Sequence, residues 1–121
     1  MNNEVIKLVL PSKPDYVGVV RLTTSAIANN IGLDIEGIED VKVAIAEACT
    51  NALGKKDELY INYKIEKDKF IMEVQDVIED IEENEKEKEL GILIIKSLMD
   101  EVYFSKKGIK MIKNIEDGID E

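Results

Sequence analysis

The spacing of apolar residues changes several times along the chain, and each change predicts a new element. Residues 5–10 form a short run rich in aliphatic and β-branched side chains, which is typical of an edge or first strand. Apolar positions three or four residues apart then predict a helix that begins at the cap signal Ser12 and ends near Ile31. Val19 and Leu22 fall outside its apolar stripe, so they either form a contact surface or are ordinary exposed aliphatic residues.

A second helix is expected between a cap at Asp34 and a stop at Gly54. Over residues 39–53 the apolar positions recur with helical spacing and form one stripe, which is expected to face a core. They are Val41, Ala44, Ile45, Ala48, Cys49, Ala52 and Leu53. The sequence therefore predicts that the other elements pack around this helix.

The later segments change period twice more. Residues 58–66 and 69–75 alternate apolar and polar side chains around a polar turn, which predicts an antiparallel hairpin. Residues 90–100 return to helical spacing, and residues 102–105 and 109–112 predict a final hairpin. The predicted fold is α+β, a two-layer sandwich with about three helices on one face of a mixed, mainly antiparallel sheet.

An acidic stretch, residues 76–89, separates the first hairpin from the third helix. Seven of the eleven residues 79–89 are Asp or Glu, and such a run predicts a solvated loop. The acidic residues 114–121 that follow Lys113 are expected to form a frayed tail.

Size and charge limit the possible functions. With 121 residues and 45% apolar content, the chain is expected to form a single domain over residues 1–121. A net charge of -10 is unsuited to a phosphate backbone, so direct binding to nucleic acid is not expected. The N-terminal residues lack a charged lead and a long apolar run, and no apolar run is long enough to cross a membrane, so a cytoplasmic protein without membrane contact is expected.

The chain contains no histidine and one cysteine, Cys49, which lies on the apolar stripe. These counts exclude Ser/His/Asp and Cys/His catalysis, a disulfide framework and most zinc chemistry. Any catalysis must therefore use carboxylates or a bound metal ion.

Glu47 and Asn51 are the candidates for such chemistry. They lie four residues apart, so on a helix their side chains stack one above the other. A carboxylate beside a carboxamide could hold a hydrated divalent cation and a water, and the glutamate could take a proton. The alternative is that Glu47 is a solvated rim residue and Asn51 a polar residue near the end of the helix.

Three blocks of sequence carry a family resemblance. Residues 11–23 (PSKPDYVGVVRLT), 38–52 (IEDVKVAIAEACTNA) and 90–102 (LGILIIKSLMDEV) resemble the bacterial anti-sigma-factor serine kinases, closest to the anti-sigma-B type. These kinases belong to the GHKL ATPase superfamily. The resemblance covers residues 8–112 in the right order and implies the sandwich fold of that superfamily, also called the Bergerat fold.

The resemblance also implies a function. In that family a homodimer sequesters a sigma factor, and it uses ATP and Mg²⁺ to phosphorylate a serine on a small anti-anti-sigma protein. A sigma factor, an anti-anti-sigma factor and a second copy of the chain are therefore the implied partners.

Five residues match functional positions of the family. The resemblance implies that Asn51 ligates magnesium, Glu47 is the general base, and Asp76 accepts the adenine amino group. It also implies that Gly91 belongs to the phosphate loop at a helix N-terminus, and that Arg21 lies on the sigma-facing surface. Without the resemblance, Asp76 is interpreted as a strand-end turn residue and Arg21 as a solvated charge.

The sequence departs from the family pattern around the nucleotide. Glycines that follow the adenine aspartate in the family are replaced, because residues 76–79 read Asp-Val-Ile-Glu. Glu89 stands where a second glycine precedes Gly91 in the family, and the shortened lid is acidic. The lid acids are Glu82, Glu83, Glu85 and Glu87.

Two hypotheses follow from these observations. The first is an anti-sigma factor with ATP-dependent serine kinase activity. The second is a degenerate relative that keeps the fold and the protein-binding surface but no longer binds ATP.

Overall fold

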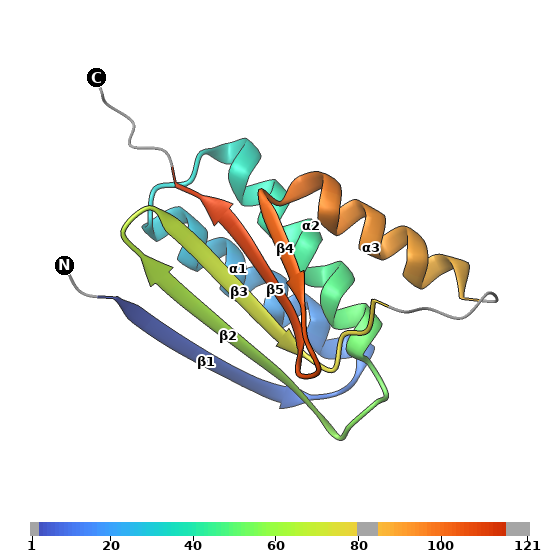
Figure 1. Ribbon diagram of the computed structural model, residues 1–121. Coiled ribbons are helices and arrows are strands. Elements are labelled where there is room, and N and C mark those ends of the chain that lie inside the picture. Colours follow the sequence, from blue (N-terminus) through green and yellow to red (C-terminus); the bar gives the residue numbers. More distant parts are fainter. Residues whose placement is uncertain (1–2, 80–84, 116–121) are drawn as a thin grey trace.

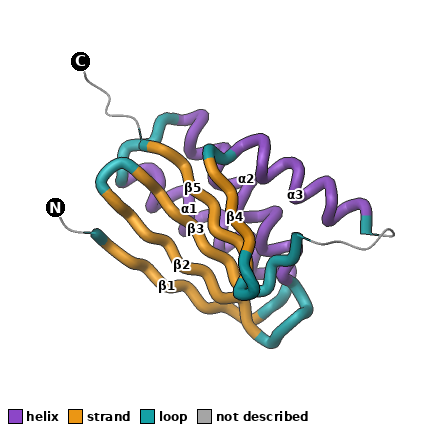
Figure 2. The backbone as a smooth tube through the Cα atoms, viewed as in Figure 1, coloured by secondary structure: helices purple, strands orange, loops and turns teal. Residues whose placement is uncertain are grey.

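The computed structural model describes residues 3–79 and 85–115 (Figure 1). Along the chain the elements are β1 (Glu4–Pro11), the short 3₁₀ turn η1 (Pro14–Tyr16), α1 (Val17–Asn30), α2 (Ile35–Ala52), β2 (Glu58–Glu66), β3 (Lys69–Gln75), α3 (Lys86–Leu98), β4 (Glu101–Phe104) and β5 (Gly108–Asn114). The three helices cover one face of the sheet, which confirms the predicted α+β sandwich (Figure 2).

The five strands form one sheet in the order β1-β2-β3-β5-β4. Every pairing between these described strands is antiparallel, so the sheet is more regular than the mixed sheet expected from sequence. The reason is the position of the last hairpin. A single helix joins β3 to β4, which gives these two strands the same direction, but β5 inserts between them and separates them.

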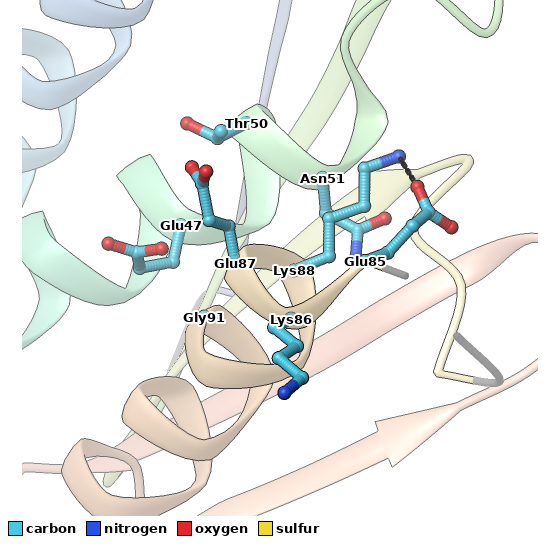
Figure 3. Close-up of a pocket in the computed structure, with 8 residues that line it drawn as sticks. All are labelled: Glu47, Thr50, Asn51, Glu85, Lys86, Glu87, Lys88 and Gly91. Carbon is cyan, nitrogen blue, oxygen red and sulfur yellow. Dashed lines mark ion pairs between the residues drawn. The ribbon is translucent and has the colours of Figure 1, made fainter. Parts of the chain in front are cut away.

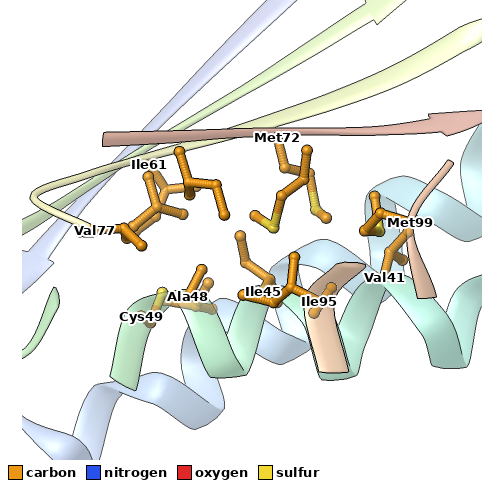
Figure 4. Packing of buried hydrophobic residues seen from close by; sticks show 14 of the residues in the cluster. Val41, Ile45, Ala48, Cys49, Ile61, Met72, Val77, Ile95 and Met99 are labelled. Atoms are coloured by element: carbon orange, nitrogen blue, oxygen red, sulfur yellow. The ribbon is translucent and has the colours of Figure 1, made fainter. Parts of the chain in front are cut away.

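The core lies between α2 and the sheet (Figure 4). The apolar stripe of α2 is buried as predicted, and Ile45 and Cys49 have no exposed surface. Burial raises the pKa of the Cys49 thiol to about 12, so the thiol stays protonated and unreactive. On β2, the ring of Tyr63 stacks on Phe70 at 6.0 Å, and its hydroxyl shares a 2.7 Å hydrogen bond with Thr24 of α1. The hydrogen bond to Thr24 ties α1 to the sheet face on which the core lies.

The caps of the second helix agree with the sequence, whereas the predicted start of the first helix is wrong. The Asp34 carboxylate accepts a hydrogen bond from the amide of Gly37 at 2.8 Å, and Gly54 has a φ of 82 just after the helix. Ser12 does not cap α1, which begins at Val17 after η1. Its hydroxyl instead accepts a hydrogen bond from the Gly54 amide at 3.1 Å, a contact between distant parts of the chain.

The third helix begins one turn earlier than predicted. Residues 86–89, which were expected to belong to the acidic loop, form the first turn of α3. Lysine and glutamate favour helices, acids in a first turn suit the helix dipole, and Lys88 pairs with Glu85 at 3.1 Å. The middle of the predicted loop (80–84) and most of the predicted tail (116–121) lie outside the described residues.

None of the helices among the described residues is long and apolar enough to cross a lipid bilayer.

Candidate functional site

A cavity of about 570 Å³ opens between the second half of α2 and the start of α3 (Figure 3). It is lined by Glu47, Thr50, Asn51, Glu85, Lys86, Glu87, Lys88 and Gly91. Three of the residues predicted from sequence, Glu47, Asn51 and Gly91, therefore border the same space. Helical spacing explains the first two, because residues four apart on α2 lie on one side of the helix.

Asn51 is 3% exposed, and its carboxamide is bonded to the protein. Its Oδ1 accepts a hydrogen bond from the Ile78 amide at 3.1 Å, and its Nδ2 donates to the Ile78 carbonyl at 3.3 Å. The Lys55 ammonium also donates to Oδ1, at 2.9 Å. The two lone pairs of this oxygen therefore both have partners.

Asp76 borders a different cavity, of about 480 Å³, together with Phe104 and Ser105. Its carboxylate pairs with the Lys56 ammonium at 3.1 Å, and its backbone has a φ of 67. The segment after it also lines this second cavity, and its Ile78 is hydrogen-bonded to Asn51, which borders the first cavity. The structure thus does not bring Asp76 into the cavity that Glu47 borders.

Gly91 is the sixth residue of α3 and is not at the N-terminus of that helix, in contrast to the expectation from the resemblance. The alternating lysine and glutamate residues 86–89 form the first turn of the helix ahead of it. A side-chain Cβ at Gly91 would lie 2.8 Å from Glu47 Oε1, so the glycine allows α3 to approach α2 closely.

We predict that Gly91→Ala leaves the protein folded and changes its free energy of unfolding by less than about 1 kcal/mol, because the gain in helix propensity offsets a small movement of Glu47. The atom that must move is the far end of a flexible side chain, and its other atoms are at ordinary contact distance. Urea denaturation of the two proteins checks this. A loss of several kcal/mol would show that Glu47 is held rigidly.

Lysine 55 is the residue of this site that the sequence analysis missed. Besides Asn51 Oδ1, its ammonium donates to the backbone carbonyl of Asp76 at 2.9 Å. Burial and, after it, the positive charge of Lys88 lower the pKa of Lys55, with opposing effects from Asp76 and Glu85. The sequence signal that could have identified Lys55 is its position four residues after Asn51. Its second hydrogen bond, to the Asp76 carbonyl, depends on a segment that is distant in sequence.

Arg21 is exposed on α1 and does not line the cavity between α2 and α3. Val19 and Leu22, two residues before it and one after it, are 41% and 73% exposed. The structure therefore separates a helix surface that carries one cation and two aliphatic side chains from the cavity that holds Glu47.

This architecture and the paired polar residues of α2 agree with one family of proteins. The sequence pattern of the histidine kinase-like ATPase domain matches residues 10–113, and the chain belongs to this family.

Within the family the chain is similar to the serine-protein kinase RsbW of several bacteria. It is 36% identical to RsbW of Oceanobacillus iheyensis, over 84% of this chain and 78% of that protein. It is 31% identical to RsbW of Listeria innocua, over 91% of this chain and 85% of that protein. The RsbU and RsbW domains of Rv1364c from Mycobacterium tuberculosis share the fold, with a TM-score of 0.65, 16% identity and coverage of 93% of this chain. The match spans 32% of that longer chain.

The family implies ATP, typically with Mg²⁺, and the arrangement of the site does not fit these ligands. Asn51 Oδ1 has no lone pair left for a metal ion. The cavity wall carries the carboxyl groups of Glu47, Glu85 and Glu87, which would repel a triphosphate, and Lys86 and Lys88 balance only part of this charge. Among the described residues no three acidic or cysteine side chains gather closely enough to hold a metal ion.

Proposed function

We propose that the chain is an anti-sigma regulatory factor that acts by binding a sigma factor or an anti-anti-sigma protein, without transferring phosphate to it. The observation that carries the proposal is the bonding of Asn51, because the family fold is complete while the carboxamide expected to hold magnesium is bonded to protein groups. The similarity to RsbW kinases supports the regulatory role. The proposal includes a cytoplasmic location and a single domain.

The outer surface of α1 is the proposed binding surface. Besides Arg21, α1 exposes the aliphatic side chains of Val19 and Leu22, and arginine is enriched among the hot spots of protein interfaces. At one edge of the sheet, β1 pairs with β2 alone among the described strands and exposes Val5 and Val9. An open apolar strand edge favours pairing with a second copy, which supports the proposed homodimer.

We predict that Arg21→Glu weakens partner binding at least about tenfold, because it reverses the only charge on α1. A pull-down from the native cell extract, with and without ATP, identifies the sigma factor or anti-anti-sigma protein, and titration with the purified partner gives the dissociation constant. Light scattering on the free chain measures whether it is a dimer.

Lys110→Glu is the matched control, because Lys110 is exposed on β5 of the sheet and the charge change is the same. It should leave the dissociation constant unchanged. Equal losses in both variants, or capture that requires ATP, would contradict the proposal.

A second candidate function is serine kinase activity, which is favoured by the position of Glu47 and Asn51 on one cavity. In this alternative, Asn51 would ligate Mg²⁺, Glu47 would be the general base, Asp76 would bind the adenine amino group, and the backbone at Gly91 would approach the phosphates. It requires the Asn51 carboxamide to leave its protein partners and the two cavities to join. The metal-binding measurement described below distinguishes the two candidates.

A further inference from the structure

Two consecutive lysines follow α2, and their ammonium groups have different surroundings. Lys56 lies on the surface, with 60% of its side chain exposed, and pairs with the Asp76 carboxylate at 3.1 Å. Lys55 turns back toward the protein, where its ammonium donates to Asn51 Oδ1 and to the Asp76 carbonyl, both at 2.9 Å. The two oxygens around this ammonium are a carboxamide and a backbone carbonyl, which are also ligands that hard divalent cations prefer.

We propose that the Lys55 ammonium is the resident cation of this site and takes the position at Asn51 Oδ1 that a divalent metal ion would need. The other lone pair of this oxygen accepts the Ile78 amide, so a metal ion could reach Oδ1 only by breaking one of two hydrogen bonds. A covalently attached ammonium satisfies the same oxygens without recruiting an ion from solution. The group of Asn51, Lys55, Asp76 and Ile78 is called the Lys55 clamp below.

Electrostatics oppose a metal ion at the clamp. The positive charge of Lys88 is already close enough to lower the pKa of Lys55. A divalent cation beside Lys55 would add a larger repulsion, since the energy between charges grows with their product. Glu85 offsets part of this charge at Lys55, but its carboxylate pairs with Lys88 at 3.1 Å.

The clamp also has a structural consequence. It connects the C-terminal turn of α2 to residues 76–79 through the reciprocal hydrogen bonds of Asn51 with Ile78 and the bridge from Lys55 to the Asp76 carbonyl. This connection keeps the cavity at Glu47 apart from the cavity at Asp76. This inference rests on the proposed function and extends it. The clamp holds the site in one conformation with hydrogen bonds within the protein, so neither a metal ion nor a nucleotide is needed there.

The first test uses Mn²⁺ as the probe, since its electron paramagnetic resonance signal distinguishes free from bound ion. The full chain is titrated at millimolar Mn²⁺, with and without ATP. The expected result is that the protein leaves the Mn²⁺ signal unchanged in both series, relative to protein-free controls of Mn²⁺ alone and of Mn²⁺ with ATP. Binding that Asn51→Ala abolishes would overturn the proposal, because Lys55 would then yield its position to a metal ion.

The second test measures hydrogen exchange of the Ile78 amide by NMR, a readout that does not depend on activity. Lys55→Met removes one partner of Asn51 and the bridge to Asp76, so exchange at Ile78 should accelerate about tenfold. Lys56→Met is the matched control, with the same charge change one residue away, and should leave the exchange rate unchanged. Because both lysines are exposed residues, both variants are expected to fold.

Equal exchange rates of the Ile78 amide in the two variants and the wild type would refute the proposal that Lys55 stabilises this site, even if no Mn²⁺ binds. The exchange readout at Ile78 is independent of partner capture. Loss of partner capture with an intact clamp would refute the anti-sigma role alone. Mn²⁺ binding with intact capture would refute the clamp and leave the binding role, and it would favour the kinase candidate over binding without phosphate transfer.

Discussion

Replacing Gly108 by alanine is expected to lower the free energy of unfolding by about 3 kcal/mol or more, one of the two largest effects that we predict. Gly108 has a φ of 155 and begins β5 opposite Gln75 of β3. A Cβ there would lie 2.1 Å from the Val74 carbonyl oxygen and 2.8 Å from the Gln75 Cα. Both are backbone atoms of a central strand, so relief requires β3 and β5 to separate at this end.

Thermal and urea denaturation followed by circular dichroism measure this effect, which corresponds to a melting temperature lower by roughly 10 °C. Gly18→Ala is the control, because Gly18 lies in α1 and has no atom within 4 Å of an added Cβ. It should leave stability unchanged or slightly higher. A Gly108→Ala protein within about 1 kcal/mol of the wild type would mean that the turn before β5 adapts freely.

The second large effect is expected at Ile45, where alanine should cost about 3 kcal/mol. This side chain has no exposed surface and packs in the core between α2 and the sheet (Figure 4). Its truncation removes apolar burial and leaves a cavity, since α2 is held on both sides by the neighbouring helices and cannot collapse into the space.

Urea denaturation gives the loss as a lower midpoint with an unchanged slope. Ile35→Ala is the matched control on the same helix, because Ile35 is 82% exposed at its start, and its effect should stay within about 0.5 kcal/mol. Similar losses at the two positions would contradict the burial that the structure assigns to this face of α2.

The parts of the fold that could be predicted from sequence are those that local pattern determines. Residues 58–66 and 69–75 alternate apolar and polar side chains, and β2 and β3 have these bounds. The start of α3 could not be found in this way, because its first turn is charged and solvated and has no apolar period. The role of Ser12 was also hidden, since its partner Gly54 is distant in sequence.

The same distinction applies to the candidate site. The four-residue spacing placed Glu47 and Asn51 side by side, and the structure finds both on one cavity. The partners of Asn51 could not be predicted, because Ile78 reaches it only after β2 and β3 have folded back along the helix layer. No periodicity in the sequence predicts such a contact. The side chain of Ile78 gives no signal either, because its backbone amide and carbonyl form the hydrogen bonds.

The backbone of Asp76 offers a separate reason for the residue found there. Its φ of 67 places it in the left-handed region, which aspartate, asparagine and glycine tolerate far better than β-branched or bulky residues. Conformational preference alone can therefore account for an acid at this bend. The match of Asp76 to the family pattern is therefore weaker evidence for purine binding than it would be at a position where any residue type could be accommodated.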